Sequence, residues 1–319
     1  MKRTALFFAL AVFLLHANAQ TWPTKPVKFI VPSGPGGTID PLGRFLADIY
    51  GRSFGQNFII ENRPGAQGNT GIAAIARAES DGYTIGIAAS SMIAINPHVY
   101  KAMPYDPRTE LTGIVMVGDV PNILVVHPDV PVKTLAEFIA YAKANPGKLN
   151  FSSGGNGTIP HMGGALLNLR AGLNMQHVPF KGGADSLTAL LGGQVQMTID
   201  GGPHVIGHIR SGALRMLGVA TLQRLAEFPN TPTIAESGIP GFESNAWQSL
   251  WVTGGTPAPV VKKISTEVMR ILRTPEMVER LRAMGMTPIG GTPEEAEAFI
   301  RAETTKWGAV IKASGAKAE

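Results

Sequence analysis

The residues best suited to chemistry lie in the stretch Val27–Asp40, which reads VKFIVPSGPGGTID. Residues 27–31 are mostly β-branched or aromatic, as in a buried strand, and the prolines and glycines that follow end the strand and permit positive φ angles. A helix should begin next, capped by Thr38 or Asp40. Backbone N–H groups in such a loop, at the positive end of a helix dipole, suit a carboxylate, phosphate or sulfate. An ordinary strand–helix turn has the same pattern, so this loop alone leaves both interpretations open.

A second glycine-rich loop has the same setting. Residues 149–153 predict a strand, residues 154–158 (GGNGT) a loop, and residues 162–171 a helix. A looser third version runs from residue 177 through Lys181 and two glycines into another helix. Two matched loops, each opening its own α/β half, favour two domains that face each other across an anion-binding cleft over a chance repetition.

We therefore expect ligand-binding residues in these loops and at neighbouring strand ends. The candidates are Ser33, Gly34, Gly36, Gly37, Thr38, Asp40, Ser90, Ser91, Ser153, Asn156, Gly157, Thr158, His161, Lys181 and Asp200.

For three of these candidates, direct contact with the anion is not the only possible role. His161, one turn into the second helix, can donate to an anion, or it can simply cap or pack. Lys181 can be a ligand cation or a hinge or surface lysine. Asp200 ends a strand and would repel an anion directly, so it would orient a water molecule or a polar group of the ligand.

The ligand's far end is less defined. No arginine lies in either loop or beside Ser90 and Asp200, so the sequence offers no fixed bidentate partner for a second carboxylate. A dicarboxylate or tricarboxylate would then be held distally by backbone, hydroxyl or water contacts, and we favour a dicarboxylate. An aromatic acid comes next, and an amino acid or nicotinate-like compound third.

Other chemical patterns have the wrong context. Residues 51–55 match G-x-S-x-G, but Ser53 follows a predicted helix, whereas a nucleophile elbow follows a strand. His204 and His208 share a helix face without a third metal ligand nearby, so a solvated or capping pair is favoured. The loops match neither dinucleotide nor P-loop motifs. We expect no metal, no cofactor and no enzymatic activity, and the alternative is an exported hydrolase of small carboxylic esters that uses Ser53 or a cleft serine.

The N-terminus has the pattern of a secretory signal. Lys2 and Arg3 precede a short apolar run, and Ala17-Asn18-Ala19 is a cleavage site of the A-x-A type, so residues 1–19 should be removed. The chain has no cysteine, which excludes disulfides, thiolate sites and a lipid anchor at that site. We therefore expect an exported, soluble periplasmic protein, a monomer. Its modest positive charge does not indicate nucleic-acid binding.

The elements alternate as strand and helix, which predicts parallel sheets with helices on both faces and ligands beyond the carboxyl ends of the strands. Three late helices, expected at residues 259–273, 275–284 and 293–313, would pack back on the first half. The predicted division is a discontinuous first domain of residues 20–124 plus 248–319, and a second domain of residues 125–247.

The chain also resembles the extracytoplasmic solute receptors of the tripartite tricarboxylate transporter family, called Bug receptors. The matching stretches include KPVKFIVP (25–32), PGGTID (35–40), ENRPGA (61–66), DGYT (81–84), NPHVY (96–100), PYDP (104–107), HVPFKG (177–182), LGGQV (191–195) and SGALR (211–215). The resemblance implies a type II-like, Venus-flytrap binding protein. In the family, the loops that match 33–38 and 154–158 grip one carboxylate through N–H groups and water. The ligand is then delivered to a membrane permease of one large and one small subunit. The chain departs from the family pattern at Phe180 and Gln196, outside both loops.

Overall fold

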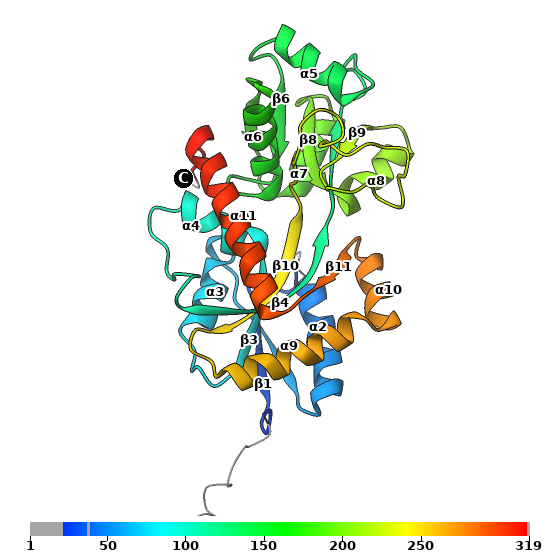
Figure 1. Ribbon diagram of the computed structural model, residues 1–319. Coiled ribbons are helices and arrows are strands. Elements are labelled where there is room, and N and C mark those ends of the chain that lie inside the picture. Colours follow the sequence, from blue (N-terminus) through cyan, green and yellow to red (C-terminus); the bar gives the residue numbers. More distant parts are fainter. Residues whose placement is uncertain (1–21, 37–38, 318–319) are drawn as a thin grey trace, which may run out of the picture.

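The protein is described here by a computed structural model that covers residues 22–36 and 39–317. The candidates Gly37 and Thr38, and the signal segment 1–19, lie outside the described residues. The chain forms two mixed α/β halves, one above the other in Figure 1, each built on its own sheet. Among the described residues, no helix has both the length and the apolar character to cross a membrane.

The first half is built on a six-stranded sheet of order β11-β4-β10-β3-β1-β2. Its strands are β1 (Val27–Val31), β2 (Phe58–Asn62), β3 (Thr84–Ala89), β4 (Leu111–Val120), β10 (Ala246–Thr253) and β11 (Thr287–Gly290). Strands β1, β2 and β3 are parallel, whereas β10 runs antiparallel to β3 and β4. The helical segments of this half are α2 (Asp40–Phe54), η2 (Ala66–Gly68), α3 (Asn69–Ala76), η3 (Ser91–Ile95, a π-helical turn), α4 (Asn96–Val99), α9 (Ala258–Leu272), α10 (Pro275–Ala283) and α11 (Pro293–Ser314).

The second half is built on a five-stranded sheet of order β7-β6-β8-β5-β9. Its strands are β5 (Asn122–Val126), β6 (Asn150–Ser153), β7 (Gln176–Pro179), β8 (Met197–Gly201) and β9 (Arg215–Val219). Its helices are α5 (Leu135–Ala144), α6 (Ile159–Ala171), α7 (Gly183–Leu191) and α8 (Gly202–Arg210). Strands β6, β7 and β8 are parallel, and β5 runs antiparallel to β8 and β9.

The chain passes between the halves where β4 leads into β5 and where it returns into β10. Helix α11 lies near the second of these passages and packs beside α6 of the second half (Figure 1). Buried Glu303 of α11 accepts from the indole N–H groups of Trp247 in β10 (3.1 Å) and Trp307 (3.0 Å), which fixes the helix to this strand. The predicted domain boundaries fall inside β5 and β10, and the division itself stays a prediction.

In both sheets the strand order reverses next to the first strand of the parallel group. In the first half, β2 and β3 flank β1; in the second, β7 and β8 flank β6. Such a topological switch point leaves a crevice outside the carboxyl ends of the two strands that diverge. The crevice of the first half therefore lies after β1 and β3, and that of the second half after β6 and β8.

Local predictions differ from the structure in several places. Helix α2 begins at Asp40 and continues through Gly51 to Phe54, so Ser53 lies in its last turn. The residue at its N-cap position is Ile39, which makes no side-chain capping bond, and Asp40 is the first helical residue rather than the cap. Strand β11 was not predicted, because its four residues include Pro288 and it pairs at the sheet edge with β4.

Candidate functional site

At the first switch point, two serine hydroxyls are buried without a partner. Ser33 follows β1 and Ser90 follows β3, and the Oγ atoms of both are shielded from solvent and form no hydrogen bond within the described protein. Ser91 begins the π-helical turn η3 next to Ser90. A buried hydroxyl normally has a partner, so these two mark a place where a ligand or a water molecule fits.

The first glycine loop uses one of its backbone donors within the protein. Gly36, at φ +75°, donates its N–H to Oδ2 of Asp40 at 2.8 Å. Asn62 and Arg44 donate to the same carboxylate at 2.7 and 2.9 Å. Burial alone would raise the pKa of Asp40, but the hydrogen bonds from Asn62, Gly36 and Arg44 outweigh it and lower that pKa. Asp40 therefore shapes the loop, and a direct contact between Asp40 and a ligand stays a prediction.

The second glycine loop repeats this arrangement. Gly157, also at φ +75°, donates its N–H to Nδ1 of His161, four residues later, at 3.1 Å. The N–H of Gly155 donates to Oγ of Ser153 at 3.2 Å. Because Nδ1 of His161 accepts, its proton sits on Nε2, which remains a possible donor. The role expected for His161 as a ligand donor and its role as a capping residue are thus compatible.

Other donors of the two loops stay free for a ligand. Within the described residues, the N–H groups of Gly34 and Asn156 donate to no other protein group. Helix α6 has Thr158 at its N-cap position without a side-chain capping bond, since the Thr158 hydroxyl donates to the carbonyl of Gly155 at 2.8 Å. Free N–H groups at uncapped helix starts are suited to an anion.

Behind the second loop lies a cluster that the sequence reasoning missed. His177 of β7 stacks on His161 and shares a 2.7 Å hydrogen bond with Ser153, and Phe151 packs against both rings. Burial lowers the pKa of His161 to about 4 and, together with the charge of His161, that of His177 to about 3. Ser153 and His177 form a serine–histidine pair, but the Ser153 hydroxyl is fully buried and is already hydrogen-bonded to the second loop, at the carbonyl and N–H of Gly155. Only the parallel pairing of β6 with β7 brings His177 here, so local sequence gave no signal.

Asp200 and Lys181 differ in how they relate to the loops. Asp200 is buried at the end of β8 and accepts from the N–H of Gly201 at 2.7 Å and from His204 Nδ1 at 3.2 Å. These partners, at the end of β8 and in α8, satisfy much of the carboxylate, and the hydrogen bond to Asp200 raises the pKa of His204. Lys181 is exposed after β7, on a turn whose Gly182 N–H donates to the carbonyl of Gly154 at 3.2 Å. It lies beside the second loop rather than at a switch point.

The two halves touch at the second loop. Gln67, in the segment after β2, donates from Nε2 to the carbonyl of Asn156 at 3.1 Å. A Cβ atom added to Gly157 would stand 3.4 Å from Val99 and 3.9 Å from Ile95 of the first half. Gln67 was not predicted as a site residue, because the family motif that covers residues 61–66 ends just before it.

The catalytic and metal-binding alternatives have no matching geometry. Ser53 hydrogen-bonds Glu267 and Arg270 from within α2, so it is not the exposed nucleophile of a strand–helix elbow. Across the residues that the structure describes, no three His, Asp or Glu side chains are grouped so as to hold a metal ion.

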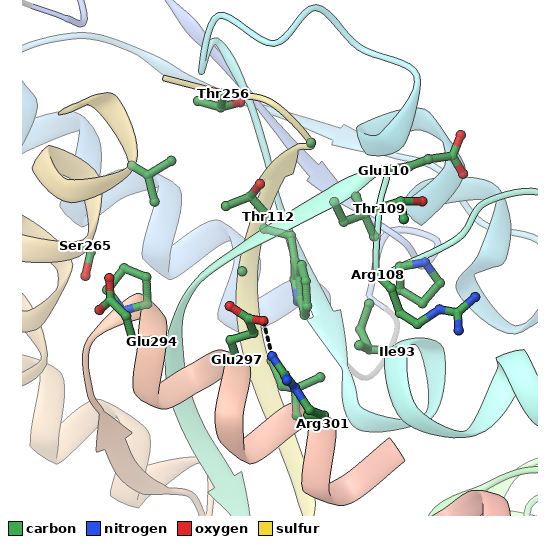
Figure 2. Close-up of a pocket in the computed structure, with 18 of the residues that line it drawn as sticks. Ile93, Arg108, Thr109, Glu110, Thr112, Thr256, Ser265, Glu294, Glu297 and Arg301 are labelled. Atoms are coloured by element: carbon green, nitrogen blue, oxygen red, sulfur yellow. Dashed lines mark hydrogen bonds and ion pairs between the residues drawn. The ribbon is translucent and has the colours of Figure 1, made fainter. Parts of the chain in front are cut away.

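A large cavity of about 2250 Å³ lies elsewhere, in the first half (Figure 2). It opens between α9, the start of α11 and the segment 103–113, and none of the described candidate residues lines it. Its charged groups are largely paired within the chain, as Arg301 is with Glu297 in Figure 2. The volume exceeds the usual 300–1,000 Å³ of a small-ligand pocket, so it is better described as an open groove.

Two α/β halves joined by crossing strands, with glycine loops at both switch points, are the architecture of periplasmic solute-binding proteins. Residues 42–316 match the family described as the tripartite tricarboxylate transporter family receptor, and the chain belongs to this family. The family resemblance inferred from the sequence motifs is thereby confirmed.

Known relatives agree with this assignment. BugT of Bordetella pertussis is 35% identical over 99% of both chains. The R. palustris protein solved with adipate is 35% identical and superposes with a TM-score of 0.79 over 93% of this chain and 99% of that one. MatC from Rhodopseudomonas palustris, solved with bound malate, is 28% identical with a TM-score of 0.75 over 91% of this chain and 100% of that one.

Proposed function

We propose that this receptor captures a small carboxylate, with a dicarboxylate as the first choice, in the space between the two switch points. The observation that carries the proposal is the pairing of the two glycine loops, each at the carboxyl end of a switch-point strand. Each loop has an N–H group, at Gly34 and at Asn156, that donates to no other group among the residues that the structure describes. Charge-assisted hydrogen bonds contribute roughly 1.5–3 kcal/mol each, so a few backbone donors suffice to hold a carboxylate.

The other candidates fit around this group. Ser33 and Ser90 supply unpartnered hydroxyls at the first switch point, and Nε2 of His161 faces no acceptor recorded in the described protein. Asp200 orients a water molecule or a polar substituent. Two relatives of this family are solved with adipate and with malate, both dicarboxylates, which supports this class over an aromatic or amino acid.

The proposal extends to partners and location. As a receptor of this family, the protein would work in the periplasm after removal of residues 1–19, as a monomer. It would hand its ligand to the large and small permease subunits of a tripartite transporter. Loss of uptake of the identified acid in cells that lack this chain, with the permease still present, would support this step.

Thermal-shift screening over adipate, malate, terephthalate, nicotinate, glutamate and neutral sugars tests the ligand class. A ligand present at 100 times its Kd adds about 2.7 kcal/mol to the free energy of unfolding, which raises the melting temperature measurably. We expect the dicarboxylates to give the largest shifts. If only sugars or cationic compounds stabilise the protein, the carboxylate assignment is wrong.

The hydrolase alternative is tested on the same samples. Incubation with p-nitrophenyl and methyl esters of these acids should leave the esters intact beyond the buffer control. Ester turnover that disappears in a serine variant would instead support the enzyme.

A further inference from the structure

The segment that joins β2 to α3 has an unusual backbone. Ala66 and Gln67 are consecutive and both lie in the left-handed region, at φ 45° and 52°, where residues with a side chain are unfavourable. They are the two described non-glycine residues with positive φ. Such conformations persist only when the surrounding structure enforces them, and they concentrate at ligand clamps and switch regions.

A buried network of polar side chains next to this segment supports its conformation. Asn96 donates to Oδ1 of Asn69 at 2.7 Å, and the hydroxyl of Tyr105 donates to the same oxygen at 3.0 Å. All three side chains are buried, and Asn96 also approaches the carbonyl of Gln67 at 3.5 Å. The segment is also packed so closely on Met92 that a Cβ atom added to Gly68 would stand 2.3 Å from that side chain. The backbone of Gln67 is therefore fixed to the first half.

The side chain of Gln67, in contrast, reaches the second half. Its Nε2 donates to the carbonyl of Asn156, in the loop that also contains the free N–H of Asn156 and the φ +75° turn at Gly157. Its Oε1 would lie 3.6 Å from a Cβ atom on Gly157. Gln67 thus forms a hydrogen bond to the second glycine loop of one half, while its own backbone is fixed in the other half.

We propose that Gln67 is a positioning residue that holds the second glycine loop against the first half and so slows ligand dissociation. The inference rests on the proposed carboxylate function. Since the bond joins groups on different halves, it stabilises the closed arrangement and is lost when the halves separate. Gln67 itself is exposed, so water replaces the bond readily and the effect is modest.

Two variants separate the amide from the backbone conformation. Gln67→Met keeps the length of the side chain and removes the donor. Gln67→Asn keeps the amide and suits the left-handed region better, but it is one methylene too short to reach Asn156. Gln223→Met is the control, because Gln223 is exposed and its side chain makes no recorded contact within the described residues.

The readouts are hydrogen exchange of residues 154–158 in the ligand-free protein and the dissociation rate of adipate and malate by stopped-flow displacement. We expect both Gln67 variants to exchange faster in this loop and to release these probes roughly 2- to 10-fold faster, with the association rate unchanged. If the Gln67 variants show the same exchange rates in residues 154–158 and the same ligand dissociation rates as Gln223→Met, the role proposed for Gln67 is wrong. Failure of the wild-type protein to bind any carboxylate would instead refute the proposed function, and the exchange measurement would still decide the inference about Gln67.

Discussion

The imidazole rings of His161 and His177 stack face to face, with centroids 3.7 Å apart and planes inclined by only 5°. Two protonated imidazoles at this distance would repel each other strongly, so the two rings are not charged together, and burial lowers the pKa of each and favours neutral rings. His161 at the same time accepts the N–H of Gly157, which ties the shape of the second glycine loop to the protonation of this pair.

The first prediction concerns acid stability. Burial lowers the pKa of His161 to about 4, whereas an unfolded histidine has its pKa near 6.5. Between these values the unfolded chain binds protons that the native protein does not, so the free energy of unfolding falls as pH falls from 6.5 to 4. His161→Gln should remove up to about 3 kcal/mol of this loss, measured by urea unfolding at several pH values.

The control for this variant is His98→Gln, since His98 is exposed. It should leave the pH dependence unchanged. A wild-type stability that stays level from pH 7 to pH 4 would contradict neutral, stacked rings.

The second prediction concerns the turn glycines of the two loops. Gly36→Ala places a side chain at φ +75°, which costs about 1–2 kcal/mol, and distorts the N–H groups near a ligand. Gly212→Ala is a matched control, because Gly212 also lies at φ +76° with open space around it, after α8. We expect both to lower the melting temperature alike, but only Gly36→Ala to weaken adipate or malate binding in calorimetry. Gly36→Val and Gly157→Val should abolish binding. Equal affinities for the two alanine variants would remove the first loop from the site.

How far the sequence could predict the site follows from which interactions are local. The strand, glycine loop and helix at residues 27–54 and 149–171 are encoded by composition over a few residues, and they appear in the structure with small shifts at their ends. Ser90, at the end of β3, was placed correctly for the same reason.

What could not be predicted depends on tertiary pairing. Whether Gly36 donates to a ligand or to Asp40 is decided by where α2 begins, and Asp40 is its first residue rather than its cap. His177 reaches Ser153 only because β7 pairs with β6, and Gln67 reaches Asn156 only because the halves meet. No local pattern contains these distances.

The third prediction compares backbone donors with side-chain charge. Lys181 lies beside the second loop but its side chain is exposed and screened by water, so a carboxylate held by loop N–H groups should gain little from it. Lys181→Ala should weaken binding less than about fivefold, well below the effect of Gly157→Val. If Lys181→Ala loses more affinity than Gly157→Val, the lysine side chain binds the carboxylate more strongly than the loop N–H groups do, and the role given to the loops is wrong.

The fourth prediction is that ligand closes the two halves. A carboxylate held from both switch points binds the closed state better, and it shifts the equilibrium by that difference in affinity. Small-angle scattering should show a smaller radius of gyration with the stabilising acid than without it. An unchanged radius with saturating ligand would mean that the halves do not move, and an acid that gives no thermal shift serves as the control.

The last prediction concerns the passage from β4 to β5, where Asp119 lies opposite Trp247 of β10 and Thr287 of β11. Burial, aided by the charge of Glu243, raises the pKa of Asp119 to about 6 from an ordinary value of 3.8. Between pH 3.8 and 6 the native protein therefore holds a proton that the unfolded chain has lost, so this carboxyl makes stability fall as pH rises through that window. Asp119→Asn should stabilise the protein at pH 7 by about 1–3 kcal/mol and change little at pH 3. Asp129→Asn, at an exposed carboxylate, should have no comparable effect. Chemical unfolding at both pH values measures the difference, and a destabilised Asp119→Asn at pH 7 would show that the ionised carboxylate contributes favourably to this passage.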